Sequence, residues 1–346
     1  MRVAAQGTSL ANPSRAEPSI QYVPVAMTGQ QSLMAFHRHL LDDTVRTETF
    51  IRAIEAVVKP GDVVVDLGTG SGILAMACCR AGARRVYAIE ANEIIRATKR
   101  VVEANGMGDT VVFIHKESSR VTLPEPVDLI VSECLGLMGP GDMMMSVVEL
   151  ARRSLREGGR ILPERVELFI APVESSLHSD YVNSWNRGRP YGFDMSIYQE
   201  IASNNVYVAW FDPESFLAPQ QRIASLRLLD DDVSKVEKQV GFRVERSGQL
   251  HGFCGWFEVE LGGGVRLNSS PSDPATIWKQ VFLPLEQPVH VEAGTEVRLD
   301  FGLVTTGVIP NMPGYFRWET ALIPPGAAAP SHVFKQSSLK SIPRAR

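Results

Sequence analysis

Residues 66–72 read Asp-Leu-Gly-Thr-Gly-Ser-Gly and form the most distinctive local motif of the chain. It follows an apolar run at 63–65 that has no polar alternation, which is typical of a strand buried on both faces in a parallel sheet. It precedes a segment with helical spacing that ends at Arg80. Glycines at such a turn let a ligand approach the backbone closely, and the N-terminus of the helix favours an anionic group. The stretch therefore predicts a nucleotide-binding loop.

Strands and helices alternate around this loop, from residue 62 to about 165. Strands are expected at 63–65, 85–90, 111–114 and 127–132. Helices are expected at 38–57, 72–80, 93–104 and 143–155, and the glycines at 158 and 159 predict the C-cap of the last helix. This alternation predicts a doubly wound, Rossmann-like α/β domain over residues 21–170.

The pattern changes after about Pro172. Short alternating segments at 242–245, 255–260, 289–292 and 296–300 are separated by Gly, Pro, Ser and Asn clusters. This spacing is typical of an antiparallel β-barrel or sandwich, which we expect over residues 171–325. Residues 1–20 and 326–346 lack periodicity, so we expect a disordered N-terminal tail and a basic, flexible C-terminal tail.

The composition is that of an ordinary globular protein. The 346 residues carry 35 Lys and Arg against 39 Asp and Glu, a formal net charge of -4, which excludes a broadly basic nucleic-acid-binding surface. The length predicts two domains. No apolar run approaches the roughly 18 residues of a membrane span, and the N-terminus has no apolar core of a secretion signal. The four cysteines lack metal-binding spacing, so we expect free thiols, no metal and a cytoplasmic protein.

The glycine spacing distinguishes two classes of cofactor. Glu90 ends the next strand about 20 residues after the loop, where an acid can bind both ribose hydroxyls of a nucleotide. A dinucleotide loop, Gly-x-Gly-x-x-Gly, requires a glycine at position 73, which is Ile73. The spacing is instead Gly-x-Gly-x-Gly after the acidic Asp66, the pattern of methyltransferases that use S-adenosylmethionine (SAM). A glycine-rich turn that binds nothing is the alternative.

Motifs outside the loop resemble those of the protein arginine methyltransferase family, over about residues 37 to 320. The matching stretches are 43–47 (Asp-Thr-Val-Arg-Thr), 161–163 (Ile-Leu-Pro), 191–195 (Tyr-Gly-Phe-Asp-Met) and 276–280 (Thr-Ile-Trp-Lys-Gln). The resemblance implies that Arg46 pairs with the methionine carboxylate of SAM, and a bidentate guanidinium–carboxylate contact gives that role a physical basis. It also implies a homodimer, in which a helical dimerisation arm near 185–195 packs on the Rossmann-like domain of the partner.

The resemblance assigns site residues as well. Cofactor contacts are expected from Arg46, Asp66, Gly68, Thr69, Gly70, Gly72, Glu90, Ser119 and Glu133. The family's catalytic loop carries two glutamates; the first is Glu133, and the second position falls on Asp142. The two carboxylates would bind and polarise a cationic guanidinium. Asp142 also precedes a helix, and capping that helix is an equally good interpretation.

The expected substrate pocket departs from the family pattern. The family's Thr-His-Trp loop has Ile277 in place of the histidine, and the loop between the two acids lacks the family's aromatic residues. Ile277 and Trp278 are expected to border the substrate, although Trp278 also suits the interior of the barrel. We therefore expect a retained cofactor site and a rebuilt substrate pocket.

Three functions stay open on the sequence. The first is SAM-dependent N-methylation of a guanidine nitrogen of arginine, in a protein or in a free arginine-like metabolite. The second is N- or O-methylation of another small molecule on the same scaffold. The third is a non-catalytic dimeric binding protein, against which the retained cofactor residues argue. The expected partners are the substrate and a second copy of the chain, with no membrane and no nucleic acid.

Overall fold

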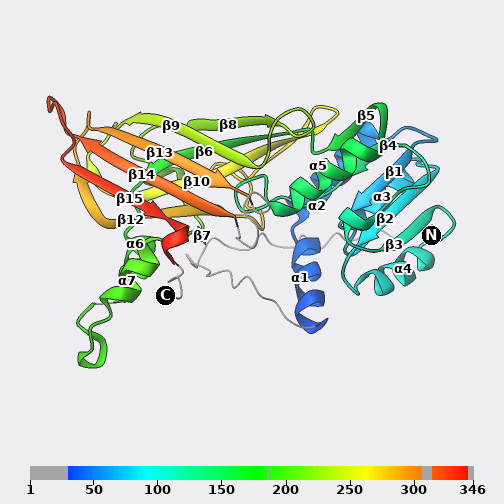
Figure 1. Ribbon diagram of the computed structural model, residues 1–346, viewed down its shortest axis with the longest axis horizontal. Helices are drawn as coiled ribbons and strands as arrows, with labels where there is room; N and C mark the ends of the chain where they lie inside the picture. The colour runs from blue at the N-terminus through cyan, green and yellow to red at the C-terminus, as the bar shows by residue number, and fades with distance from the viewer. Residues whose placement is uncertain (1–29, 186, 306–313, 342–346) are drawn as a thin grey trace, which may run out of the picture.

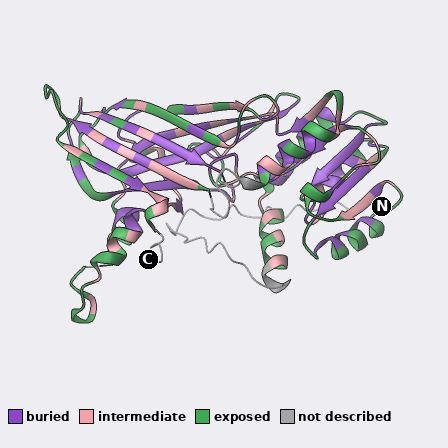
Figure 2. Cartoon of the chain, viewed as in Figure 1, coloured by how far each residue is buried: buried purple, intermediate pink, exposed green. Residues whose placement is uncertain are grey.

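The computed structural model describes residues 30–341, except 186 and 306–313 (Figure 1). Its N-terminal part contains the strands β1 Val63–Leu67, β2 Arg85–Glu90, β3 Val111–His115, β4 Val127–Val131 and β5 Leu155–Leu162. They form one parallel sheet in the order β3-β2-β1-β4-β5. The central strand β1 is buried along its whole length (Figure 2), as expected when both faces of a parallel sheet are covered.

The helices of this part are α1 Gln30–Asp42, α2 Thr44–Val57, α3 Ile73–Arg80, α4 Ile95–Ala104 and α5 Asp142–Ser154, with the short 3-10 helix η1 Ser118–Arg120. The helix α3 starts directly after the glycine loop, which places the loop at the carboxyl edge of the sheet. That edge is where ligands bind in open α/β sheets.

The C-terminal part consists of antiparallel strands. They are β6 Arg165–Val173, β7 Tyr207–Ala209, β8 Gln221–Arg227, β9 Lys235–Arg243, β10 Gly248–Gly262, β11 Val265–Asn268, β12 Gln280–Val291, β13 Glu296–Val304, β14 Tyr315–Ile323 and β15 His332–Ser337. One sheet has the order β7-β12-β10-β6-β8, with β11 paired to β10, and the other has the order β15-β14-β13-β9. Fully buried aromatic side chains, among them Phe253, Phe301 and Trp318, pack in the core of this C-terminal part.

A helical arm, residues 176–204, projects from this antiparallel domain at the lower left of Figure 1. It contains α6 Ser176–Val182, the 3-10 helix η2 Pro190–Gly192 and α7 Ser196–Ser203; two further 3-10 helices are η3 Pro213–Ser215 and η4 Ser338–Ser341. Its exposed large apolar side chains are Leu177, Tyr181, Trp185, Tyr191, Phe193, Ile197 and Tyr198. Tyr191 is 97% exposed and Phe193 is 65% exposed, so the tip of the arm is apolar and uncovered in the single chain.

The helix α2 lies where the two parts of the chain meet. It contacts α3 on one side and the strands β10 and β11 on the other. At its C-terminal end the packing is close, because a Cβ added at Gly263 would lie 2.7 Å from the Cβ of Ala56. The helix that carries Arg46 is therefore in contact with both domains.

The predicted α/β domain followed by an antiparallel domain is confirmed, but three predicted elements differ. The helix expected at 38–57 is two helices, because Asp43 leaves the helical conformation (φ -75°, ψ 88°) and caps α2. The helix expected at 143–155 ends at Ser154, and Gly158 and Gly159 lie inside β5, where the chain returns to pair with β4, so the predicted glycine C-cap is wrong.

The third difference concerns the C-terminal tail. Residues 332–337 form β15, which pairs with β14 and buries Phe334 and Gln336, so the predicted flexible tail is wrong for this segment. The predicted N-terminal tail, residues 1–20, lies outside the described residues. Within the described ranges, no helix is both long and apolar enough to cross a membrane.

Candidate active site

The glycine loop forms a close-fitting cradle after β1. Gly70 has φ +49°, and a Cβ added there would lie 2.6 Å from Cε1 of His37. The hydroxyl of Thr98 donates a hydrogen bond to the Gly70 carbonyl, which fixes the loop from α4. Gly72 is the N-cap residue of α3 with φ +83°. Side chains at Gly70 and Gly72 would collide with His37 and Thr98, so only glycine fits the positive φ angles and close packing of this loop.

Two buried acids hold the loop in place. Glu90, at the end of β2, accepts the N–H of Gly70 at 3.1 Å and the N–H of Asn92 at 2.9 Å. Asp66, on β1, accepts the Thr69 hydroxyl at 2.6 Å, and burial raises its pKa to about 6. The carboxyl ends of neighbouring strands thus bring both acids to the loop, where a carboxylate can meet the ribose of a nucleotide.

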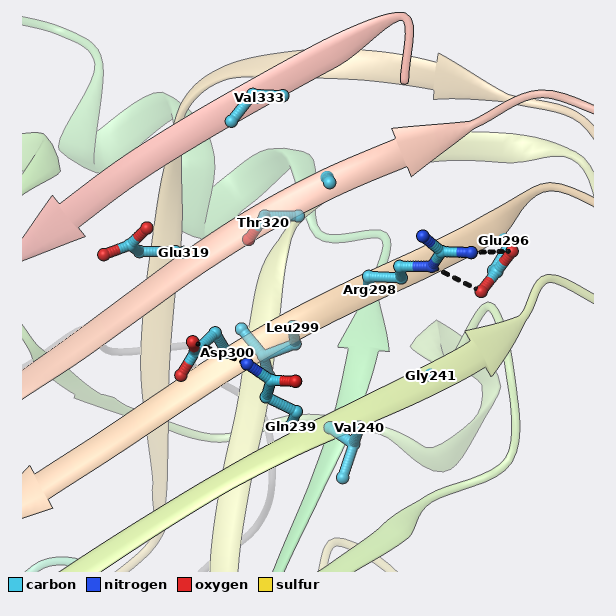
Figure 3. A pocket seen from close by; sticks show the side chains of 11 residues that line it. Gln239, Val240, Gly241, Glu296, Arg298, Leu299, Asp300, Glu319, Thr320 and Val333 are labelled. Carbon is cyan, nitrogen blue, oxygen red and sulfur yellow. Dashed lines mark hydrogen bonds and ion pairs between the residues drawn. The ribbon is translucent and has the colours of Figure 1, made fainter. Parts of the chain in front are cut away.

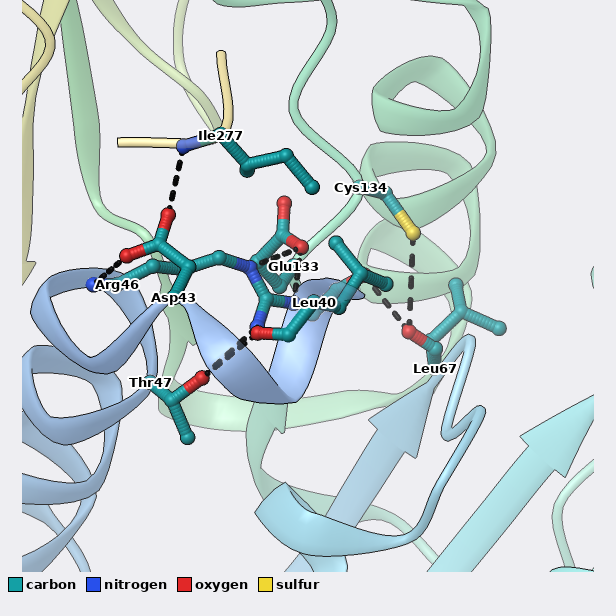
Figure 4. A network of polar contacts seen from close by, with 9 residues as sticks. Leu40, Asp43, Arg46, Thr47, Leu67, Glu133, Cys134 and Ile277 are labelled. Atoms are coloured by element: carbon teal, nitrogen blue, oxygen red, sulfur yellow. Dashed lines mark hydrogen bonds and ion pairs between the residues drawn. The ribbon is translucent and has the colours of Figure 1, made fainter. Parts of the chain in front are cut away.

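A buried ion pair lies on the side of α2 (Figure 4). Nε of Arg46 donates to Oε2 of Glu133 at 2.7 Å, and Nη2 donates to the same oxygen. The two side chains are only 7% and 8% exposed. Burial raises the pKa of Glu133, and the charge of Arg46 opposes that rise. The guanidinium expected to meet the cofactor is therefore a direct neighbour of the carboxylate expected to meet the substrate.

The loop between β4 and α5 carries Glu133 and is anchored on the antiparallel domain. The N–H of Gly136 donates to the carbonyl of Gly139 at 2.7 Å and closes a tight turn. Met138 is buried in that turn, and a Cβ added at Gly255 would lie 2.8 Å from its Cε. A larger residue at position 255 would thus push against the Met138 side chain of this loop.

The second predicted acid, Asp142, is the first residue of α5. The N-cap residue of this helix is Gly141, so Asp142 is not the N-cap that the sequence also allowed. The side chain of Asp142 lies outside the described structure. Its backbone position keeps it on the same loop as Glu133, and its catalytic role stays a prediction.

The predicted substrate residues lie on the turn before β12. Trp278 is 7% exposed and packs edge-to-face on Phe257, with ring centroids 5.2 Å apart. Ile277 is partly buried, and its backbone N–H donates to Oδ2 of Asp43 at 2.7 Å. Ser119 is exposed on η1, after the carboxyl end of β3. The structure therefore brings the Ile277 backbone close to the Arg46 helix and leaves Ser119 at the margin of the site.

Sequence reasoning missed the role of Asp43. Oδ1 of this residue accepts the backbone N–H of Arg46 at 2.9 Å, and Oδ2 accepts the N–H of Ile277. An aspartate three residues before Arg46, ahead of a new helical period, is an N-cap signal that would have found the first bond. No sequence signal could have found the second, because its partner is 234 residues away.

A hollow of about 420 Å³ lies elsewhere, on the sheet β15-β14-β13-β9 (Figure 3). It is lined by side chains such as Gln239, Asp300 and Glu319, and the ion pair between Arg298 and Glu296 lies at its rim. None of the predicted site residues lines it. The candidate active site therefore lies at the carboxyl edge of the parallel sheet and not in this hollow.

Comparisons with known proteins agree with this arrangement. Residues 164–308 match the family model described as the arginine methyltransferase oligomerization subdomain, and residues 44–163 match the model of the ribosomal protein L11 methyltransferase. Protein arginine N-methyltransferase 6 of Xenopus laevis is 35% identical over 292 residues, which cover 80% of this chain and 86% of that protein. An arginine N(omega)-methyltransferase of Streptomyces achromogenes subsp. streptozoticus is 31% identical over 287 residues, which cover 80% of this chain and 78% of that protein.

Solved structures have the same fold. A Trypanosoma brucei protein arginine methyltransferase 1 enzyme–prozyme complex superposes with a TM-score of 0.78 at 21% identity, covering 87% of this chain and 97% of that chain. Protein arginine methyltransferase 10 of Arabidopsis thaliana superposes with a TM-score of 0.77 at 24% identity, covering 88% and 98% of the two chains.

The fold and the site define this chain as a SAM-dependent methyltransferase. The glycine cradle beside Glu90 fits a nucleoside, and the buried guanidinium of Arg46 fits a carboxylate. By its identity to relatives along most of their length, the chain belongs to the protein arginine N-methyltransferase family.

Proposed function

We propose that this chain transfers the methyl group of SAM to a guanidine nitrogen of arginine. The observation that carries the proposal is the buried contact of Arg46 with Glu133 beside the glycine loop. Arg46, Glu90 and the loop would hold SAM, which supplies an electrophilic methyl group on a sulfonium when bound. Relatives that are named arginine methyltransferases support arginine as the acceptor.

Glu133 would act on the acceptor. A guanidinium is a poor nucleophile because its nitrogen lone pairs are delocalised. A carboxylate that binds two of its nitrogens localises the positive charge there and leaves the third nitrogen free to attack. Burial raises the pKa of Glu133, so a cationic acceptor would stabilise the charged form that this role needs.

Asp142 is proposed as the second acid of the loop. Asp142→Asn should lower turnover because one of the two charges that bind the guanidinium is lost. Since Gly141 is the N-cap residue of α5, position 142 lies in the first turn of the helix, where a negative charge contributes about 0.3–1 kcal/mol. A large fall in turnover with a melting temperature lowered by no more than about 4 °C would separate the catalytic role from a structural one.

The remaining assignments complete the proposal. Ser119 is proposed at the adenosine end of the cofactor, and Ile277 and Trp278 at the acceptor end. The residues of the chain are divided into a SAM-binding domain, 21–170, and a substrate and dimerisation domain with a β-barrel form, 171–325. The antiparallel pairing among the strands from β6 through β15 supports the assignment of the second domain.

Transfer of a labelled methyl group from SAM tests the function directly. The chain is incubated with histones, with ribosomal proteins and with free arginine, and the products are hydrolysed and separated. Label in methylarginine is the expected result, and the acceptor that carries it distinguishes protein from free arginine. Label found only in a non-guanidine product would reject the proposal. Calorimetric binding of NAD without binding of SAM would reject the cofactor site as well.

We also propose a homodimer joined by the arm. The family model that covers residues 164–308 is named for oligomerization, which supports an assembly. The uncovered apolar side chains of the arm, such as Trp185 and Phe193, are the kind of anchors that such a contact uses.

A cytoplasmic location is proposed in addition. The cysteines Cys78, Cys79, Cys134 and Cys254 are free, and free thiols persist in a reducing compartment. Cell fractionation tests this location.

A further inference from the structure

The carboxylate of Asp43 joins the two domains at the candidate site. Asp43 stands between α1 and α2, and its two oxygens have different partners (Figure 4). Oδ1 accepts the backbone N–H of Arg46 at 2.9 Å, within the same turn of α2. Oδ2 accepts the backbone N–H of Ile277 at 2.7 Å, from the turn that precedes β12 in the antiparallel domain. One side chain therefore binds the start of the Arg46 helix and the turn that leads into Trp278.

Both partners of Asp43 lead to groups placed at the site. On one side, the guanidinium of Arg46 binds Glu133 in a nearly dry environment. On the other side, Trp278 follows Ile277 and packs on Phe257. Lys279 then has φ +53°, a left-handed conformation that is unfavourable for a residue other than glycine. Such a turn keeps its shape only where its surroundings hold it, and the bond to Asp43 is one of those restraints.

The geometry gives Asp43 no proton to transfer. Each carboxylate oxygen accepts a backbone N–H, and neither of these donors titrates. The side chain at position 277 is isoleucine, which offers no acid or base. The carboxylate therefore acts by holding backbone and not by chemistry.

We propose that Asp43 is a positioning residue for methyl transfer. Its carboxylate sets the distance between the cofactor side of the site, on α2, and the acceptor side, at residues 276–279. This proposal rests on the proposed function. Because α2 already packs on Gly262 and Gly263 at its other end, loss of the Asp43 bond would free only the end near Arg46. A shift of about 1 Å between reacting groups can lower a rate about 100-fold.

The test compares three variants of the full chain. Asp43→Ser keeps a hydroxyl that can cap α2 but is too short to reach Ile277 as well. Asp43→Asn keeps the length, but its amide has a single acceptor oxygen for two N–H groups. Asp42→Ser is the matched control, because Asp42 is the neighbouring exposed acid and its ion pair is with Arg38 on the same helix.

Hydrogen exchange of the Ile277 amide gives a readout that does not depend on activity. In Asp43→Ser this amide should exchange at least about tenfold faster, and in Asp42→Ser it should exchange as in the wild type. We call the two bonds from the Asp43 carboxylate, to Arg46 and to Ile277, the clamp. Unchanged exchange of the Ile277 amide in both Asp43 variants would show that the clamp does not exist, whatever the chain methylates.

Kinetics gives the second readout. Asp43→Ser should lower kcat about 10- to 100-fold, while the Kd for S-adenosylhomocysteine stays within about threefold and the pH–rate profile keeps its shape. A wild-type kcat in Asp43→Ser, or the loss of one limb of its pH–rate profile, would overturn the positioning role. If the wild-type chain methylates no guanidine, the proposed function fails, and the exchange experiment still decides whether the clamp exists.

Discussion

At the scale of single residues, the most informative contact is the one between Arg46 and Glu133. Breaking a buried ion pair on one side leaves an uncompensated charge, so neither residue can be changed without an effect on the other. Burial raises the pKa of Glu133, and Arg46 counteracts this effect. The pair therefore places a positive charge against a carboxylate whose charged form is disfavoured by burial.

Glu133→Gln should lower kcat at least about 100-fold, because the amide keeps the size of the side chain but loses the charge that polarises a guanidinium. The Kd for S-adenosylhomocysteine should stay within about threefold, since the methionine carboxylate of the ligand can replace Glu133 as the counter-charge of Arg46. Steady-state kinetics and calorimetry measure the two effects. Glu149→Gln, an exposed change on α5, is the matched control. Full activity of Glu133→Gln would show that the methyl acceptor is not a guanidine.

The sequence predicted these two residues one by one, but it could not predict their contact. Each belongs to a short motif that stands out along the chain. Their side chains meet across 87 residues of sequence, and only the fold brings the start of α2 beside the loop that follows β4. The second partner of Asp43 escaped prediction for the same reason, because a backbone N–H leaves no mark in a sequence.

At the scale of elements, local patterns predicted the parallel strands β1 to β4 but not the fifth strand, β5. Their apolar runs are short and continuous, and each ends at a turn signal. Two of the three misassigned elements have a form that depends on a distant partner, whereas the break at Asp43 is a local N-cap. The strand β15 looks like a basic tail until its pairing with β14 is known, and Gly158 looks like a helix cap until β5 is seen beside β4.

Gly70→Ala should weaken binding of S-adenosylhomocysteine at least about tenfold. The added Cβ would meet the His37 ring at 2.6 Å, in a loop whose φ of +49° also costs an alanine roughly 1–2 kcal/mol. Gly106→Ala is the control, since Gly106 has φ +74° but nothing within 4 Å of its added Cβ. Calorimetry and thermal unfolding separate the steric effect from the backbone cost. Equal affinity in both variants would show that the cradle does not meet the cofactor.

The free energy of unfolding should fall in acid because of a buried histidine on α6, the first helix of the arm. His178 on α6 is buried beside Phe211, and burial lowers its pKa to about 4 from an ordinary 6.5. The unfolded chain takes up a proton near pH 6.5, whereas the folded chain does so only near pH 4. The contribution of His178 to the free energy of unfolding is therefore fully present above pH 6.5. It falls by about 1.4 kcal/mol per pH unit as the pH is lowered from 6.5 to 4.

Denaturant unfolding at pH 7, 6 and 5 measures this slope. His178→Gln should be less stable at pH 7 by about 1 kcal/mol, because the contact with Ser175 is weakened, and its stability should depend less on pH. His39→Gln, an exposed change on α1, should keep the wild-type slope. A His178→Gln slope equal to that of the wild type would contradict the assignment.

At the scale of the whole molecule, the arm and the parallel sheet lie at opposite ends of the long axis of the molecule (Figure 1). The exposed apolar side chains of the arm therefore have no nearby surface of the α/β domain of their own chain to cover them. A second copy that offers its α/β domain would cover them and would offer its own arm in return, as a two-fold contact requires.

Light scattering at micromolar concentration should therefore give twice the 38.0 kDa mass of the chain. The double change Phe193→Ser and Ile197→Ser should give the single-chain mass, because it removes apolar area at the centre of the proposed contact. Val333→Ser on β15 is the control, since Val333 is 56% exposed but lies outside the arm. A monomeric wild-type chain would refute the dimer.

The strand β15 ties the last part of the chain to the base of the arm. The side-chain amide of Gln336 donates to the carbonyl of Ser203, and the N–H of Ser337 donates to Oδ1 of Asn204 at 3.0 Å. During synthesis, α7 leaves the ribosome more than a hundred residues before these donors do. The base of the arm therefore acquires these two bonds only after residue 337 has been synthesised. A message truncated before codon 332 would yield a polypeptide that carries the whole arm and the whole glycine loop but lacks these two bonds at the arm's base.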